Sequence, residues 1–221
     1  MKKLIALFLV FHIFLQFSFA QFYIEPTTGY KFSTGTTEPK FKMLNTGFQL
    51  AWKYTSHYEL LLQLQYSWPI SSNAVDSAFT LNPSLPINIL VPFAVKPSIS
   101  SIAIGHRFKI TTNKSPDILS ILLYTGVAFQ QIKVSYQYNK SDYILLNPLQ
   151  TQQRIGLFLS TGLEYMRQLE NGRVFFQALI ATPSSGRNKP PPPSLAFKAI
   201  ISLNAGYSIM LKKYSHGKKK D

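Results

Sequence analysis

Residues 58–68 read YELLLQLQYSW, and this stretch alternates between two kinds of side chain. Every second residue from Tyr58 to Trp68 is apolar or aromatic, and the polar residues Glu59, Gln63, Gln65 and Ser67 lie between them. In an extended strand successive side chains point to opposite faces, whereas helical spacing would mix the two sets. The stretch therefore predicts a β-strand with one apolar and one polar face.

The same alternation recurs in seven further segments, at 22–33, 41–55, 98–110, 119–138, 152–168, 173–182 and 194–211. Most of these segments have about the ten residues that a tilted strand needs to cross a membrane. The predicted connections form two groups: 34–40, 70–97, 139–151 and 183–193 lie at one end and all but the first are long, whereas 56–57, 111–118 and 169–172 lie at the other end and have eight residues or fewer. This asymmetry is typical of outer-membrane barrels, which have short periplasmic turns and long outer loops.

Side-chain size predicts which face of each strand meets lipid. The polar faces carry small residues, namely the glycines at 29, 47, 105, 126, 156, 162 and 206. The apolar faces are bulky, as with Phe48, Leu50 and Trp52. The interior of an eight-stranded barrel is just wide enough for its own side chains, so the small polar faces belong inside. The chain is predicted to be all-β, a closed antiparallel up-and-down eight-stranded transmembrane β-barrel.

The first twenty residues have the features of an export signal. Lys2 and Lys3 precede an apolar run, and Ser18-Phe19-Ala20 matches the small-residue pattern of a cleavage site. A retained membrane helix is the alternative, although the run is short and contains His12 and Gln16. We therefore expect a signal peptide at 1–20, an outer-membrane barrel at 21–211 and a basic periplasmic tail at 212–221. Both termini would be periplasmic and the long loops extracellular, in a Gram-negative cell.

The formal net charge is +14, and the chain contains no cysteine. Export argues against nucleic acid as the partner of this charge, and the basic tail is expected to be solvated or to rest on anionic lipid headgroups. No phosphate-binding loop, nucleophile elbow or metal-ligand spacing is present in the sequence, so we expect no cofactor, no metal site and no catalytic residue.

A lipid-modifying enzyme would need a histidine base near the outer leaflet. The mature histidines are His57, in a predicted periplasmic turn, His106, on a lipid-facing position low on a strand, and His216, in the tail. None of them is placed for that chemistry, so we expect that the protein is not an enzyme.

Charged residues on the predicted inward faces form two sets. The periplasmic half is expected to hold a lumen charge cluster of Glu25, Glu59, Glu164, Lys53, Arg107, Lys109 and Arg173, in which acids and bases pair. The outer half is expected to hold a basic set without acids, made of Lys31, Lys133, Arg154 and Lys198. This set is interpreted as a solvated vestibule or as an anion site for phosphate or lipopolysaccharide groups.

The last strand carries Asn204, Gly206, Ile209 and Leu211 in alternating phase, and this pattern resembles the C-terminal assembly signal of the bacterial outer-membrane barrel family. The resemblance implies insertion by the outer-membrane assembly machinery. One departure is that the chain continues from Lys212 to Asp221, whereas family members commonly end at an aromatic residue. The overall size and the Phe19-Ala20-Gln21 junction also resemble the small barrels of Bacteroidota, including the PorT-like secretion-associated family.

Three functions remain open at this stage. The first is a non-enzymatic barrel with a structural or surface-interaction role through its outer loops, in contact with outer-membrane lipid and lipopolysaccharide. The second is an accessory subunit of a secretion or envelope-assembly complex, as the PorT-like resemblance implies. The third is a lipid-modifying enzyme. The apolar stretch Ile87–Val91 in the predicted loop 70–97 is expected to be a contact surface, to pack on the barrel rim, or to extend the neighbouring strands.

Overall fold

The computed structural model describes residues 21–34, 41–111, 115–146, 148–183 and 199–211. Within this part of the chain there are ten strands: β1 (Gln21–Thr34), β2 (Lys42–Lys53), β3 (Tyr58–Ile70), β4 (Ser72–Thr80), β5 (Asn88–Lys109), β6 (Asp117–Tyr136), β7 (Tyr143–Leu145), β8 (Gln152–Leu169), β9 (Gly172–Pro183) and β10 (Ala199–Met210). No helix in these ranges is long and apolar enough to cross a membrane.

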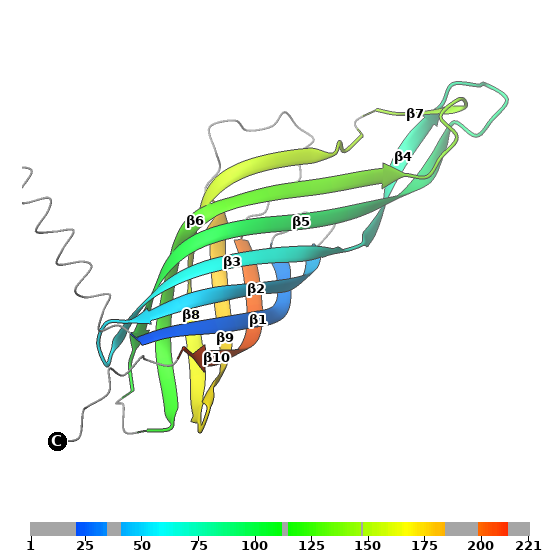
Figure 1. Ribbon diagram of the computed structural model, residues 1–221. Helices are drawn as coiled ribbons and strands as arrows, with labels where there is room; N and C mark the ends of the chain where they lie inside the picture. Colours follow the sequence, from blue (N-terminus) through cyan, green and yellow to red (C-terminus); the bar gives the residue numbers. More distant parts are fainter. Residues whose placement is uncertain (1–20, 35–40, 112–114, 147, 184–198, 212–221) are drawn as a thin grey trace, which may run out of the picture.

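Eight of the strands close into a barrel (Figure 1). Around the wall the order is β1, β2, β3, β5, β6, β8, β9 and β10, and β10 pairs with β1 to complete the ring. Every pairing is antiparallel, and β3 bypasses β4 to pair with β5. The predicted eight-stranded antiparallel barrel is therefore confirmed.

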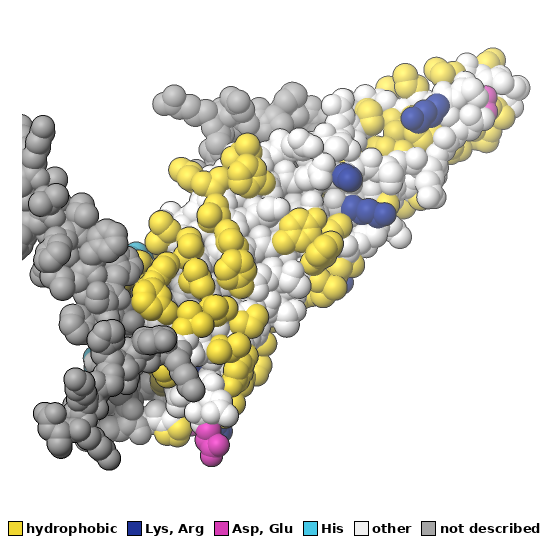
Figure 2. Space-filling model, viewed as in Figure 1, with side chains coloured by type: hydrophobic (Ala, Val, Ile, Leu, Met, Phe, Trp, Pro, Cys, Tyr) yellow, Lys and Arg dark blue, Asp and Glu magenta, His cyan; other side chains and the backbone are white. Residues whose placement is uncertain are grey.

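The two faces of the wall separate as the alternation predicts. On β8 the outward residues Leu157, Leu159 and Leu163 are each more than half exposed, whereas the inward Glu164 is fully buried. Hydrophobic side chains gather over the barrel wall in Figure 2. A water-soluble protein rarely exposes so large an apolar surface, so this exterior is one that faces lipid.

Two inward glycines make room for aromatic rings in the lumen. A Cβ atom added at Gly105 would lie 2.3 Å from the ring of Tyr124, and one added at Gly206 would lie 2.3 Å from the ring of Phe175. Both rings belong to fully buried side chains. The glycines on the polar faces thus admit large inward side chains rather than leaving open space.

The lumen has polar and apolar layers. Ile118, Met166 and Phe175 close the end that carries the short turns. The opposite end is filled by an outer apolar cluster, whose buried members are Phe41, Met43, Phe93, Val95, Ile99, Ala128, Ile132 and Ile200. The expectation of small and polar residues throughout the lumen was wrong for this half, because the inward positions of β5 and β6 here are mostly apolar.

The predicted loop 70–97 is largely strand. β4 and the first half of β5 form a hairpin with Ser72 opposite Val95, and β7 adds to β4 inside the predicted loop 139–151. We name as the projecting sheet β4, β7 and residues 88–92 of β5. It extends well beyond the barrel wall (Figure 1). Of the expected roles for this segment, extension of the neighbouring strands is the one observed.

The start of β1 and the end of β10 lie at the same end of the barrel, where Tyr23 pairs with Met210. The strand ends that flank the three short connections, at Lys53 and Tyr58, Lys109 and Asp117, and Leu169 and Gly172, lie at this end as well. The predicted signal peptide, the tail at 212–221 and Lys198 lie outside the described residues.

Candidate functional site

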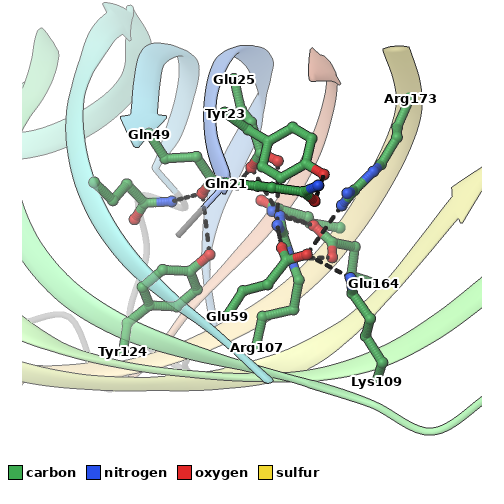
Figure 3. Close-up of polar contacts among 12 residues, drawn as sticks. Gln21, Tyr23, Glu25, Gln49, Glu59, Arg107, Lys109, Tyr124, Glu164 and Arg173 are labelled. Carbon is green, nitrogen blue, oxygen red and sulfur yellow. Dashed lines mark hydrogen bonds and ion pairs between the residues drawn. The ribbon is translucent and has the colours of Figure 1, made fainter. Parts of the chain in front are cut away.

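The lumen holds a charge network around Arg107 (Figure 3). Arg107 is fully buried on β5 and contacts three fully buried carboxylates from three other strands. Its Nη1 lies 3.1 Å from Glu25 Oε1 and 2.6 Å from Glu59 Oε2, and its Nη2 lies 2.9 Å from Glu164 Oε2. Arg107 Nε also lies 2.6 Å from Glu164 Oε1. These two atoms form an ion pair but not a hydrogen bond. One guanidinium therefore ties β1, β3, β5 and β8 together.

Two further cations complete this network at Glu59. Lys109 Nζ pairs with Glu59 Oε1, and Arg173 Nη1 lies 3.0 Å from the same oxygen. The guanidinium of Arg173 also lies over the ring of Tyr23, with its carbon 4.0 Å from the ring centroid. Three carboxylates and three cations thus balance, and such pairing offsets the cost of burying charge. Lys53 forms no ion pair within the described part of the chain, although the register places it opposite Glu59.

Neutral side chains add hydrogen bonds to two of the carboxylates of the network, Glu25 and Glu164. Gln49 donates to Glu25 and accepts a hydrogen bond of 3.1 Å from the hydroxyl of Tyr124. Gln177 donates to Glu164 Oε2 at 2.8 Å. All three carboxylates are thereby held between fixed donors, which is an arrangement for rigidity rather than for proton transfer.

No group of histidine, cysteine, aspartate and glutamate side chains within the described ranges could hold a metal ion. His106 lies on the outward face of β5, 2.7 Å from the hydroxyl of Tyr58. It stacks against Tyr58 and Phe108 in an aromatic group on the barrel exterior. His106 is therefore part of the exterior wall, as its sequence position predicts.

Of the predicted outer basic set, the described residues are Lys31, Arg154 and Lys133, and only the first two face inward. Lys31 is buried in the lumen, and Arg154 is inward and half-buried, donating to Gln152 at 2.6 Å. Lys133 was wrongly placed inside. Even-numbered residues of β6 point inward from Ile118 to Ile132, so the odd-numbered Lys133 is exposed on the outer face. There it lies directly opposite Lys96 of β5, which is also exposed.

The residues of the predicted assembly signal alternate across the last strand. Asn204 is buried and accepts a hydrogen bond of 2.9 Å from Asn45, and Gly206 also faces inward. Ile209 and Leu211 are nearly half exposed on the outside. The motif thus presents apolar side chains to lipid along the strand that closes the barrel.

A second feature is an apolar face on the projecting sheet, which the sequence reasoning located only in part. Val75 is 60% exposed and Leu90 is 74% exposed, and the register places Ser77 opposite Leu90 and Pro92 opposite Val75. Phe79 and Ile144 are opposite each other on β4 and β7 and are also exposed. The other face is packed, because Ala78, Val91 and Leu145 form a small buried cluster. The sheet therefore buries one apolar face and exposes the other.

No family model matches the chain, and no curated protein matches it either. Solved structures of bacterial outer-membrane barrels do match. The N-terminal β-barrel domain of Pseudomonas aeruginosa OprF is 16% identical, with 86% of this chain and 97% of that chain covered and a TM-score of 0.40. Neisserial surface protein A is 14% identical, with 85% and 96% covered and a TM-score of 0.45. A major outer membrane protein from Thermus thermophilus is 12% identical, with 87% and 99% covered and a TM-score of 0.49. The likeness concerns the fold alone.

Proposed function

We propose that this chain is a non-enzymatic outer-membrane protein that binds a protein partner through the projecting sheet. The observation that carries the proposal is the exposed apolar face around Val75, Leu90 and Ile144. An exposed apolar patch on a folded surface is typical of a contact site. The rest of the barrel supports this reading, because its buried carboxylates are already bound by cations and amides.

The apolar face is distinct from the lipid-facing belt of the barrel wall. Between them on the outward side of β5 lie Lys96, Ser98 and Ser100, and on β6 lie Gln131 and Lys133. A polar zone of this kind is what a strand presents at the water interface of a membrane. The projecting sheet would therefore stand in water, where its apolar face has no lipid to cover it.

In this proposal the short-turn end of the barrel faces the periplasm and the projecting sheet faces the outside of the cell. Both described strand termini then lie on the periplasmic side, as the length of the connections predicts. The outer-membrane assembly machinery would recognise the last strand and insert the barrel into the membrane. The recognised motif would be Asn204, Gly206, Ile209 and Leu211.

Lipopolysaccharide is the second partner that we propose, at the paired Lys96 and Lys133. Like charges directly opposite each other on neighbouring strands repel, so an anionic phosphate between them would be favourable. Four residues further along the same strands, at Ser100 and Phe129, the outer wall has an apolar groove of about 450 Å³ that also includes Phe48 and Tyr66 and is suited to an acyl chain. We expect the double variant Lys96→Ser/Lys133→Ser to copurify with less lipopolysaccharide than the wild type. Lys140→Ser, an exposed lysine elsewhere, should copurify with the normal amount.

An accessory subunit of a secretion or envelope-assembly complex, similar to PorT, is the alternative. The same apolar face would then bind another component of that complex. The two functions differ in the identity of the bound protein, so the same crosslinking experiment separates them.

The test places a photo-crosslinking residue at Leu90 in intact cells. We expect a discrete protein adduct at Leu90 and none at Leu157, which is 63% exposed but on the lipid-facing wall. A second variant replaces residues 76–91 with Asn-Gly, a turn that joins Val75 to its register partner Pro92. This variant keeps Phe93 and Val95 of the outer apolar cluster, so it should still migrate differently before and after boiling on SDS gels. It should lose the partner.

The absence of an adduct at Leu90, or equal adducts at Leu90 and Leu157, would contradict the proposal. Failure of the shortened variant to fold would show that the projecting sheet is required for the barrel itself.

A further inference from the structure

The barrel lumen contains a cavity of about 40 Å³ between the charge network and the outer apolar cluster. Leu179 belongs to its lower wall, and Ile99 and Ile200 of the outer apolar cluster belong to its upper wall. Polar side chains from six strands also line it, among them those of Lys31, Gln65, Ser101, Gln130, Ser160 and Ser202. The cavity has room for about three water-sized spheres.

Hydrogen-bond donors in this cavity outnumber the acceptors that they reach. Lys31 is 7% exposed, and its Nζ donates one hydrogen bond, of 2.9 Å, to Gln65 Oε1. An ammonium group has three N–H donors, so two of them find no acceptor among the described residues. Gln65 Nε2 is buried and also has no partner there. A lysine ammonium and an amide donor therefore face the cavity with N–H groups that no described acceptor binds.

Lys31 is also uncompensated in charge. The three carboxylates of the Arg107 network are matched by Arg107, Lys109 and Arg173, so none is left over for Lys31. Of the residues that line the cavity, Lys31 alone is charged. An unpaired buried cation is costly, and a bound counter-ion that also accepts its hydrogen bonds offsets part of that cost.

We infer that the cavity binds one small monovalent inorganic anion of the halide class. Lys31 Nζ and Gln65 Nε2 would donate to it, together with the hydroxyl groups of Ser101 and Ser202. One positive charge selects a monovalent ion, because a doubly charged phosphate would need a second cation. Water molecules alone would satisfy the donors but would leave the charge of Lys31 unbalanced.

The first test compares the unfolding temperature of the detergent-purified protein in sodium chloride and in sodium gluconate at equal ionic strength. A ligand that binds only the folded state stabilises it by mass action, so we expect a rise of about 5 °C in chloride. Lys31→Met removes the cation and should abolish the difference. Arg154→Gln removes another inward cation of the same half, which does not line the cavity, and should keep the difference. An equal effect of chloride on Lys31→Met and the wild type would overturn the inference.

The second test needs no variant and therefore holds even if Lys31→Met fails to fold. Wild-type crystals grown in sodium bromide should show an anomalous scattering peak within hydrogen-bonding distance of Lys31 Nζ. Peaks at exposed lysines only, with none in the lumen, would mean an adventitious ion only and would overturn the inference. The absence of any bromide peak in the lumen would overturn it in the same way.

Discussion

Arg107→Leu is expected to lower the free energy of unfolding by at least about 3–5 kcal/mol, the usual cost of removing one partner of a buried ion pair. The reason is that Arg107 contacts Glu25, Glu59 and Glu164, and all three side chains are fully buried. Lys109 and Arg173 would still pair with Glu59, but Glu25 and Glu164 would keep only the amides of Gln49 and Gln177. Urea titrations of refolding into detergent micelles would measure the loss.

Arg167→Leu is the matched control for this substitution. Arg167 is an exposed arginine on β8, and its Nε lies 3.9 Å from a carboxylate oxygen of the half-exposed Asp117. An exposed pair of this kind contributes roughly 0–1 kcal/mol, so the refolding midpoint should hardly change.

Glu164→Gln added to Arg107→Leu should recover part of the lost stability, because it removes one of the carboxylate charges that Arg107→Leu leaves without a cation. Equal midpoints for Arg107→Leu and Arg167→Leu would contradict a structural role for the network.

The second large effect is expected for Leu159→Arg. Leu159 is 53% exposed on the outward face of β8, near the middle of the apolar belt. An arginine facing the membrane midplane costs about 2–4 kcal/mol in an outer-membrane barrel. The same urea titration, carried out in lipid vesicles, would measure it.

Leu146→Arg makes the same substitution at a residue beside the projecting sheet that is 67% exposed. Here the new charge would lie in water, and the free energy of unfolding should change by about 0.5 kcal/mol or less. If the two variants were equally destabilised, the barrel wall and the projecting sheet would share one environment, and the proposed membrane position would be wrong.

The strands of the barrel wall could be predicted because each has one lipid-facing and one lumen-facing side. The segment predicted at 152–168 is observed as Gln152–Leu169, and that at 173–182 as Gly172–Pro183. A closed barrel with lipid outside leaves a strict period of two in the sequence, and this period also places Glu25, Glu59, Glu164 and Arg107 inside.

Residues 70–97 were predicted as a loop, with extension of the neighbouring strands as one of three alternatives for 87–91, because the projecting sheet lacks this pattern. Around Leu90 both faces of β5 are apolar, since Ile89 and Val91 face the packed side while Leu90 is exposed. Pro92 and Pro97 also suggested a loop, because a proline removes one donor from the ladder of a strand. Pairing with β4 and β6 on either side nonetheless holds β5 as a strand here.

The cavity at Lys31 and the outer apolar cluster depend on packing that sequence does not reveal. Lys31, Lys133, Arg154 and Lys198 were grouped by their expected height along the barrel. Side chains of a strand alternate strictly between its two faces. The inward residues of β6 are the even-numbered ones, so Lys133 lies on the outside although it has the expected height along the barrel. Sequence alone also does not show that Phe41 and Phe93 fill the lumen above Lys31.

The central claim is that β8 and its neighbours form a wall with lipid on one side and a packed lumen on the other. The chain contains no cysteine, so single cysteines can be introduced one at a time along β8 and labelled with a fluorophore before folding into vesicles of brominated lipid. Brominated acyl chains quench only fluorophores that they contact. The account predicts strong quenching at Ile155, Leu157, Leu159 and Leu163 and weak quenching at Gly156, Phe158, Ser160 and Gly162. Uniform quenching along the strand, or none, would contradict it.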